Sequence, residues 1–301
     1  MTVISLKLPK QRGAGKSASS SLKTAKGRLR SSFFCFKGMI GRQSKSIFMN
    51  NVFSLHKHAN YRGISSLVRS TISTLKGKKV LVLGFSNRWT HKEGERDIPK
   101  TERLGRLLAN SIGSGSEYMD VFKMKIYPCE ANISASEGNS CGVIKASLKD
   151  AAKNPTGNHR CWASINNKDD ELWKVSKALF ESEAVLFVTP IRWGQACATY
   201  QKLIERLSWL ENMHTTLGEK NILAEKTAGF ICIGHNWNGE NVVKTQKQVL
   251  EFFGFNVDDS LCWNWQWTGD AEDETQKGYK KDAHEFASEF VQMTIRKTEN
   301  D

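Results

Sequence analysis

Three polar, glycine-containing loops carry residue types that could bind an anionic, flat aromatic ligand. The most informative loop follows the apolar run Ala184 to Val188 and consists of Thr189, Pro190, Ile191, Arg192, Trp193 and Gly194. Proline restricts the backbone, Gly194 permits close approach of a ligand, and the other residues offer backbone amides and an aromatic surface. This composition suits a flat heteroaromatic ring. A plain strand-to-helix turn with Trp193 packed inward also fits the sequence.

A second loop follows the apolar run Val80 to Leu83 and leads into an expected helix. Donors and cations flank that helix start, at Ser86, Arg88, Lys100 and Thr101. Backbone N–H groups and the positive end of the helix dipole bind anions at such a position. No second glycine follows Gly84 two residues later, so a single phosphate fits better than the pyrophosphate of a dinucleotide. The alternative is that Thr101 only caps the helix and Arg88 is solvated.

The third loop follows the apolar run Ala228 to Ile233 and is bounded by Gly234 and Gly239. Its ligand-capable residues are His235, Asn236, Trp237 and Gly239. A single histidine in such a loop is more often a plain loop residue than a catalyst. If the preceding strands are parallel, however, all three loops lie at the carboxyl edge of one sheet, where α/β proteins bind ligands.

The elements that would position these loops follow from hydrophobic patterning. Apolar runs that do not alternate predict buried parallel strands at 80–83, 184–188, 228–233 and, less clearly, 255–262, with a weakly alternating edge strand at 118–125. Apolar residues recur every three or four positions in the four intervening segments, around Leu104, Leu172, Leu203 and Val242. The pattern predicts an α/β fold with a doubly wound, five-stranded parallel sheet and helices on both faces.

Two further segments are unusual. Residues 128–167 are too long for an ordinary connection and are expected to form an insertion, of the kind that is usually a lid or an interface, with a short helix at Val143 to Ala152. Trp263, Trp265 and Trp267 alternate after the last expected strand, where they would cover the sheet edge, form a subunit contact or stack on a ligand. A final amphipathic helix is expected from Tyr279 to Phe290, which completes a domain at 76–301.

The positive charge is concentrated at the N-terminus. Of the 44 Lys and Arg residues, 17 lie between Lys7 and Lys79, and the first acidic residue is Glu93. The remaining 27 basic residues stand against 31 acidic ones, which leaves a net charge of −4 from Val80 onward. Residues 1–75 are therefore expected to form a basic, acid-free, largely disordered extension, and no nucleic-acid partner is expected for the core.

That extension could be a mitochondrial or plastid transit peptide, a solvated tail, an over-long start of the chain, or a tail that binds RNA or a membrane surface. No apolar run approaches the roughly 18 residues of a membrane span. The seven cysteines show no pairing pattern, which favours reduced thiols in an intracellular compartment. We therefore expect a soluble protein, cytoplasmic or organellar. Cys129, Cys141 and Cys161 are too widely spaced to predict a zinc or iron–sulfur site.

From about Lys78 to Val257 the sequence resembles the flavodoxin-like family of NAD(P)H-dependent FMN reductases and related quinone, azo-dye and metal-ion reductases. The resemblance rests on the residues of the second and third loops and on the 189–194 motif. It also rests on Cys161 ahead of Asn167 to Asp170, and on Lys202, Glu205 and Arg206 in the helix after the motif. It implies a flavodoxin-like strand order 2-1-3-4-5.

The resemblance also implies noncovalent FMN. Its phosphate would bind at Ser86, Arg88 and Thr101, and its ring would lie against residues 190–194 and be closed on the other side by residues 236–239. The sequence departs from the family in two places. Family members commonly have Tyr or Phe where this chain has Arg192, and residues 90–99 lengthen the second loop.

The expected function is an FMN-dependent NAD(P)H oxidoreductase. A hydride would pass from NADPH or NADH through flavin N5 to a small-molecule acceptor: a quinone, a free flavin, a nitro or azo compound or a metal ion. No catalytic side chain is expected, although Arg192 could modulate the flavin or grip the NADPH phosphate. A homodimer or homotetramer is expected. The alternatives are a flavodoxin-like electron-transfer protein without a nicotinamide site, and a non-enzymatic α/β scaffold that acts through its basic tail.

Overall fold

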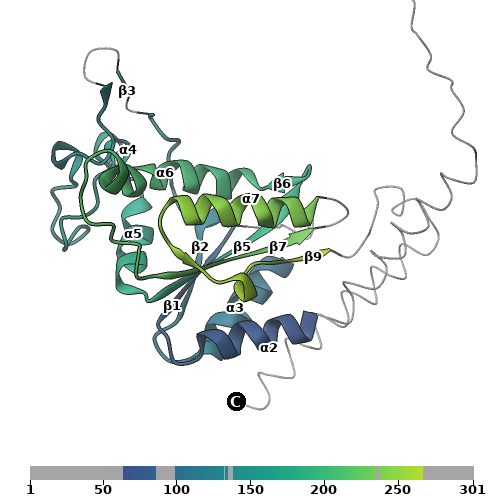
Figure 1. Cartoon of the computed structure of the whole chain (residues 1–301). Helices are drawn as coiled ribbons and strands as arrows, with labels where there is room; N and C mark the ends of the chain where they lie inside the picture. Colours follow the sequence, from purple (N-terminus) through teal and green to yellow (C-terminus); the bar gives the residue numbers. More distant parts are fainter. Residues whose placement is uncertain (1–63, 86–98, 132, 135–137, 235–237, 267–301) are drawn as a thin grey trace, which may run out of the picture. The chain divides into compact units, whose positions relative to one another are not determined.

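A computed structural model describes residues 64–85, 99–131, 133–134, 138–234 and 238–266. Its centre is one sheet in the order β2-β1-β5-β7-β8, in which these neighbours are parallel (Figure 1). The strands of this sheet are β1 (Val80–Gly84), β2 (Glu117–Asp120), β5 (Ala184–Arg192), β6 (Gln195–Ala196), β7 (Thr227–Gly234), β8 (Asn256–Val257) and β9 (Trp263–Gln266). When these five parallel strands are numbered 1 to 5 in chain order, the sheet has the predicted flavodoxin-like order 2-1-3-4-5.

Helices cover both faces of the sheet, as predicted (Figure 1). α2 (Ile64–Leu75) and α3 (Lys100–Ile112) pack on the face that carries Val80 and Val82. α5 (Leu172–Glu181), α6 (Ala198–Thr215) and α7 (Gly239–Phe252) pack on the opposite face, which carries Leu81 and Leu83. Because successive residues of a strand point to opposite faces, a strand covered on both sides must be apolar throughout. All five residues of β1 are buried.

Helix α2 corrects the predicted limit of the N-terminal extension. It lies within residues 1–75, yet Val68, Thr71 and Leu75 are buried against the domain. The indole Nε1 of Trp263 donates a hydrogen bond of 3.1 Å to Thr71 Oγ1, which joins α2 to the last strand. The folded domain therefore includes residues 64–75. Residues 1–63, Trp267 and the expected helix at 279–290 lie outside the described residues.

The fifth position of the sheet is divided between two short strands. β8 and β9 both pair with β7, and a 3-10 turn, η3 (Asp259–Leu261), separates them. The Asp258 side chain accepts a hydrogen bond of 2.8 Å from Ser260 N–H, and Leu261 lies against Gly229, where an added Cβ would be 2.5 Å from the Leu261 Cβ. The prediction of one strand at 255–262 is thus wrong in its bounds. Trp263 and Trp265 belong to β9 and are buried in the α2–α3 face.

The insertion contains little regular structure. β2 ends at Asp120 instead of continuing to Lys125, because a 3-10 turn, η1 (Val121–Lys123), follows it directly. β3 (Ile133–Ser134) pairs with β4 (Gly138–Asn139), and α4 (Trp162–Asn166) precedes α5. The helix predicted at 143–152 is wrong. Only η2 (Ile144–Ala146) forms, because Asp150 accepts from Ala152 N–H and the Asn154 side chain donates to Leu148 O, local bonds that compete with a helix.

The insertion packs on the second half of α6. Asn212 donates to Cys141 O at 2.5 Å, and Gly142 lies so close to the helix that an added Cβ would be 2.7 Å from Trp209 O. Trp209 lies 11 residues along α6 from its first residue, Ala198, or about 16 Å at 1.5 Å per residue. The described part of the insertion therefore covers the end of α6 remote from β6.

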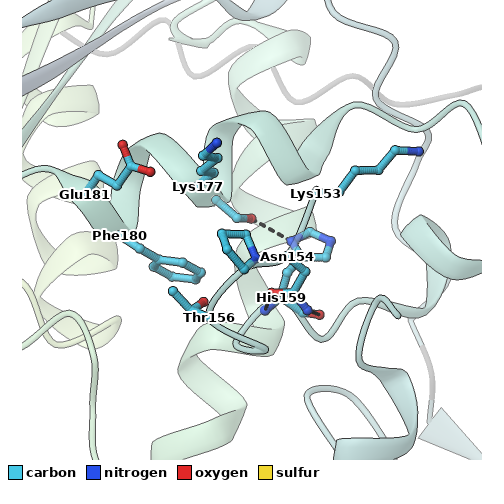
Figure 2. A pocket seen from close by; sticks show the side chains of 9 residues that line it. Lys153, Asn154, Thr156, His159, Lys177, Phe180 and Glu181 are labelled. Atoms are coloured by element: carbon cyan, nitrogen blue, oxygen red, sulfur yellow. Dashed lines mark hydrogen bonds between the residues drawn. The ribbon is translucent and has the colours of Figure 1, made fainter. Parts of the chain in front are cut away.

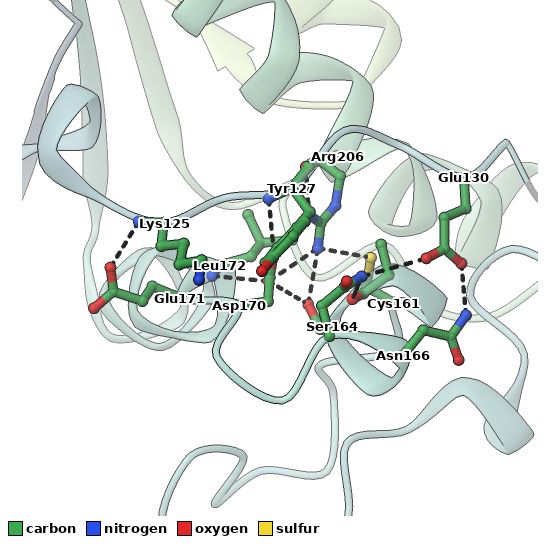
Figure 3. A network of polar contacts seen from close by, with 12 residues as sticks. Lys125, Tyr127, Glu130, Cys161, Ser164, Asn166, Asp170, Glu171, Leu172 and Arg206 are labelled. Atoms are coloured by element: carbon green, nitrogen blue, oxygen red, sulfur yellow. Dashed lines mark hydrogen bonds and ion pairs between the residues drawn. The ribbon is translucent and has the colours of Figure 1, made fainter.

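A buried ion pair anchors the insertion (Figure 3). The guanidinium of Arg206, on α6, donates to both carboxylate oxygens of Asp170 at 2.8 and 3.0 Å, and both side chains are fully buried. Arg206 also donates to Tyr127 O at 2.7 Å and to Ser164 Oγ at 2.9 Å. Burial opposes ionisation of Asp170, but the hydrogen bonds and charge of Arg206 outweigh it and hold the pKa of Asp170 below its usual value.

Among the helices that the structure describes, none is long and apolar enough to cross a membrane.

Candidate functional site

The described parts of the three loops meet at one edge of the sheet. Parallel pairing places Gly84, at the end of β1, beside Val188 of β5, and Pro190 of β5 beside Ile233 of β7. The predicted site residues that the structure describes at this edge are Lys100, Thr101, Thr189, Pro190, Ile191, Arg192, Trp193, Gly194 and Gly239. The others, Ser86, Arg88, His235, Asn236 and Trp237, lie outside the described residues.

The start of α3 has the features of an anion site. Its N-cap is Pro99, and no side chain of the described residues caps the helix. Thr101, the second residue of α3, is 3% exposed, and its Oγ1 finds no hydrogen-bond partner in the described part of the chain. A buried hydroxyl without a partner is costly and is normally explained by an absent ligand or water. The alternative role of Thr101 as a helix cap is not observed.

The one acidic side chain in the first turn of α3 is already paired. Glu102 is buried, and Arg106 donates to its Oε1 through Nε at 3.1 Å and through Nη2 at 3.0 Å. This pairing reduces the repulsion that the carboxylate would exert on an anion at the helix start. Gly84 also has a packing role, because an added Cβ would be 2.0 Å from the hydroxyl of Tyr118.

The motif at 189–194 forms a tight hairpin. Arg192 pairs with Gln195 in the antiparallel β5–β6 ladder, so Trp193 and Gly194 are the two turn residues. Both have positive φ angles, 51° and 67°, as a type I′ turn requires. For a residue with a Cβ this conformation costs about 1 kcal/mol. The Trp193 side chain is 91% exposed, so the alternative in which it packs inward is wrong.

Asn238 joins this hairpin to the third loop. Its side-chain Nδ2 donates to Gly194 O at 2.7 Å, and its Oδ1 accepts from Asn241 Nδ2 at 2.8 Å. Asn238 has a φ of 66°, a conformation that asparagine tolerates better than most residues. Asn238 lies within residues 236–239, which the family resemblance placed against one side of the flavin ring, but the bond to the hairpin was not predicted. The sequence signal that could have indicated this role is the pair Asn238-Gly239 at the start of α7.

The base of the site is tightly packed. Cys197, at the start of α6, donates through Sγ to Phe85 O at 3.5 Å, and its Sγ lies 3.3 Å from Thr189 Oγ1. The ring of Tyr200 contacts those of Phe85 and Phe187 edge to face at centroid distances of 5.3 and 5.9 Å. These contacts join the ends of β1 and β5 to α6 and give the loops a rigid support.

Two hollows lie in the insertion and on α5, and neither is lined by residues of the carboxyl edge. One has a cavity volume of about 20 Å³ and is lined by Asn154, His159 and Phe180, among others (Figure 2). The other, of about 250 Å³ and partly open to solvent, is lined by Trp173 and Lys168, among others. Within the described ranges, no group of three or more His, Cys, Asp or Glu residues is arranged to hold a metal ion.

His159, beside the first hollow, gives a prediction about pH. Its Nδ1 lies 2.8 Å from Ser176 Oγ, and burial lowers its pKa from 6.5 to about 4 (Figure 2). The unfolded chain binds the proton more tightly, so stability should fall as the pH drops below 6.5 until it reaches about 4. The loss should be about 2 kcal/mol between pH 6.5 and 5. Urea unfolding at both pH values measures it.

His159→Gln should reduce that difference by about the same amount, because glutamine does not titrate in this range. The same replacement at the half-buried His214 is the control. An unchanged pH dependence in His159→Gln would show that His159 does not remain neutral in the folded protein.

The comparisons with known proteins give one family match, over the second half of the chain. The model of the NADPH-dependent FMN reductase family matches residues 134–266, which include the hairpin, Asn238 and the start of α7. No curated protein matches the chain. The match confirms the predicted family resemblance and the predicted cofactors, FMN and a nicotinamide nucleotide, as those of the family.

Solved structures show low sequence identity over most of the chain. RosB with a bound 8-demethyl-8-formylriboflavin-5'-phosphate intermediate is 15% identical, with 74% of this chain and 81% of that chain covered and a TM-score of 0.43. An azoreductase from Bacillus anthracis is 12% identical, with 73% and 99% covered and a TM-score of 0.40. A WrbA-like flavodoxin from Agrobacterium tumefaciens is 13% identical, with 73% and 99% covered and a TM-score of 0.35.

Proposed function

Because the chain matches the NADPH-dependent FMN reductase family, and is in general terms a flavin oxidoreductase, we propose that it binds FMN at the carboxyl edge and oxidises NAD(P)H there. The observation that carries the location is the buried hydroxyl of Thr101, which has no hydrogen-bond partner among the described residues. It lies at a helix start that no described side chain caps, at the sheet edge where the 189–194 hairpin also lies. A phosphate accepts hydrogen bonds both from the free N–H groups of a helix start and from a hydroxyl.

In this proposal the phosphate of FMN binds at the start of α3. Thr101 and the first backbone N–H groups donate to it, and Lys100 adds positive charge. Ser86 and Arg88, in the same loop, would complete the set. The carboxylate of Glu102 is paired with Arg106, which reduces its repulsion of an anion here.

The flavin ring would lie along the backbone of Pro190 to Gly194. The hairpin is held by its own ladder and by Asn238, so its amides are fixed before the ligand arrives, which lowers the entropic cost of binding. Bound FMN would supply the redox chemistry, because its N5 accepts a hydride from NAD(P)H and the reduced ring passes the electrons on. The protein contributes binding, orientation and exclusion of water.

Arg192 is the last residue of β5 and is exposed. It belongs to the segment that would bind the ring. There it could stabilise negative charge on the flavin or bind the phosphate of NADPH. The same proposal includes NADPH or NADH as the cosubstrate. It also includes assembly into a homodimer or homotetramer.

Titration of the purified full-length protein with FMN and with riboflavin tests this site. We expect FMN to bind at least tenfold more tightly than riboflavin, because only FMN carries the phosphate, and a charged hydrogen-bonded group contributes about 1.5–3 kcal/mol. Quenching of flavin fluorescence measures both affinities. Equal affinities would contradict a phosphate site at α3.

The Thr101→Val variant sharpens the test. It should weaken FMN binding roughly tenfold, because the hydroxyl is lost, and should leave the stability of the unliganded protein unchanged or higher, because that hydroxyl is buried without a partner. Thr101→Ser, which keeps the hydroxyl, is the matched control and should retain FMN affinity. If both variants bind FMN as the original protein does, Thr101 does not contact the phosphate.

A further inference from the structure

The larger of the two hollows has the lining of a ligand site. It has a volume of about 250 Å³, is partly open to solvent, and is lined by residues of the insertion and by Trp173 at the start of α5. None of its lining residues belongs to the β5–β6 hairpin or to α3. We propose that this hollow binds a small aromatic carboxylate with one ring or two fused rings. The inference does not depend on the proposed FMN site.

The volume of the hollow limits the size of its ligand. A cavity of about 150 Å³ is large enough for benzene, and pockets for drug-sized ligands begin at about 300 Å³. A hollow of about 250 Å³ therefore accommodates one or two rings with a short substituent. It is too small to enclose a second FMN or a nicotinamide nucleotide.

The walls of the hollow are apolar and aromatic. Trp173 is half-buried, and Leu148 and Ile165 line the hollow with it. A flat ring that stacks on an indole gains attraction beyond the burial of its apolar surface. A hydrophilic anion such as inorganic phosphate would make no use of these walls. The walls therefore favour a ligand with an aromatic ring.

Two lysines give the lining a positive charge. Lys168 is exposed and has no ion-pair partner in the part of the chain that the structure describes. Lys153 lies 3.8 Å from Asp150, at the limit of an ion pair, and its Nζ is 6.0 Å from the centroid of the Trp173 ring. A ring stacked on Trp173 would carry its carboxylate close to an ammonium group, so an anion is favoured over a cation.

The buried carboxylate in the lining is already neutralised. Asp170 accepts hydrogen bonds from Arg206, from Ser164 Oγ at 2.8 Å and from two backbone N–H groups (Figure 3). Its charge is balanced by the Arg206 guanidinium, which reduces its repulsion of an anionic ligand. Ser164 Oγ donates to Asp170 and accepts from Arg206, so it is not free to act as a nucleophile. The lining is therefore suited to binding and not to catalysis.

Equilibrium dialysis of the full-length protein against 2-naphthoate and against its neutral amide, 2-naphthamide, tests the proposal. We expect 2-naphthoate to bind roughly fivefold more tightly than the amide at low ionic strength, because a partly exposed ion pair contributes about that factor. Excess FMN should leave the affinity for 2-naphthoate unchanged, because the hollow shares no residue with the carboxyl edge.

Variants of the lining separate the charge from the ring. Lys168→Met should weaken the binding of 2-naphthoate roughly threefold and leave that of the amide unchanged, and Lys168→Arg should restore it. Trp173→Leu should weaken the binding of both probes roughly fivefold, because an apolar wall remains but stacking is lost. Lys177→Met is the matched control, because Lys177 is an exposed lysine of α5 that does not line this hollow.

Four results would overturn the proposal. Absence of 2-naphthoate binding at millimolar concentration would show that the hollow is not a site for this class of ligand. Equal affinities for the acid and the amide would show that the lysines do not select an anion. Displacement of the probe by FMN would place it at the carboxyl edge, and unchanged binding in both Lys168→Met and Trp173→Leu would place it elsewhere. A protein that binds 2-naphthoate as expected but not FMN would contradict the proposed function alone.

Discussion

Arg206→Met is expected to lower the free energy of unfolding by about 3–5 kcal/mol. Methionine fills much of the space of the arginine stem but leaves the carboxylate of Asp170 buried without its positive partner. It also removes the donors to Tyr127 O and Ser164 Oγ, so the insertion loses one of its attachments to α6. Urea unfolding of the full-length protein at pH 7 measures the loss.

A second variant separates the charge from the packing. Asp170→Asn combined with Arg206→Met removes the unpaired charge and should regain part of the loss, because a neutral amide costs less to bury than a carboxylate. Arg160→Met is the matched control. Its 2.6 Å pair with Glu219 is 14% and 34% exposed, so about 1 kcal/mol or less is expected. A loss in Arg206→Met no larger than in Arg160→Met would contradict the assignment.

Gly142→Ala should destabilise the protein by roughly 2–5 kcal/mol, the sum of a left-handed backbone penalty and an overpacking penalty. Gly142 has a φ of 78°, and an added Cβ would be 2.7 Å from the carbonyl oxygen of Trp209 and 3.1 Å from Met213 Cγ. A carbonyl within a helix cannot move aside at low cost. The insertion would therefore have to shift away from α6.

Gly138→Ala is the control for this variant. Gly138 lies in the same insertion with a φ of 70°, but no atom lies within 4 Å of its added Cβ. The free energy of unfolding of this variant should fall only by the backbone penalty, about 1–2 kcal/mol. The difference in urea unfolding between the two variants measures the contact between the insertion and α6. Equal losses in the two variants would show that this contact adds nothing to stability.

The parallel core was predictable because its strands are buried on both faces. The run Ala184 to Val188 has no polar interruption, and such a run is typical of a central strand. Helix α2 was missed because its serines, threonines and Arg69 resemble the preceding extension. Val68, Thr71 and Leu75 nevertheless recur at helical spacing within it. The interrupted fifth strand depends on Gly229, whose missing side chain makes room for Leu261 on another segment.

The place of the candidate loops in the fold was predictable, but their detailed contacts were not. Pro190 and Gly194 mark a loop at a strand end, and strand order then places it at the carboxyl edge. That Trp193 faces solvent depends on a two-residue hairpin, which is set by the pairing of Arg192 with Gln195. The residues Asp170 and Arg206, noted for their family resemblance, proved to pair across 36 positions, and a single sequence does not show which charges meet.

The central claim, that the carboxyl edge holds FMN that NAD(P)H reduces, is tested most directly by visible absorption spectroscopy under nitrogen. The full-length protein, incubated with FMN and freed of unbound flavin, should keep the yellow colour of bound flavin and should be bleached by NADPH or NADH. A protein that stays colourless would contradict the FMN site. A yellow protein that neither nucleotide bleaches would contradict the oxidoreductase and favour an electron carrier.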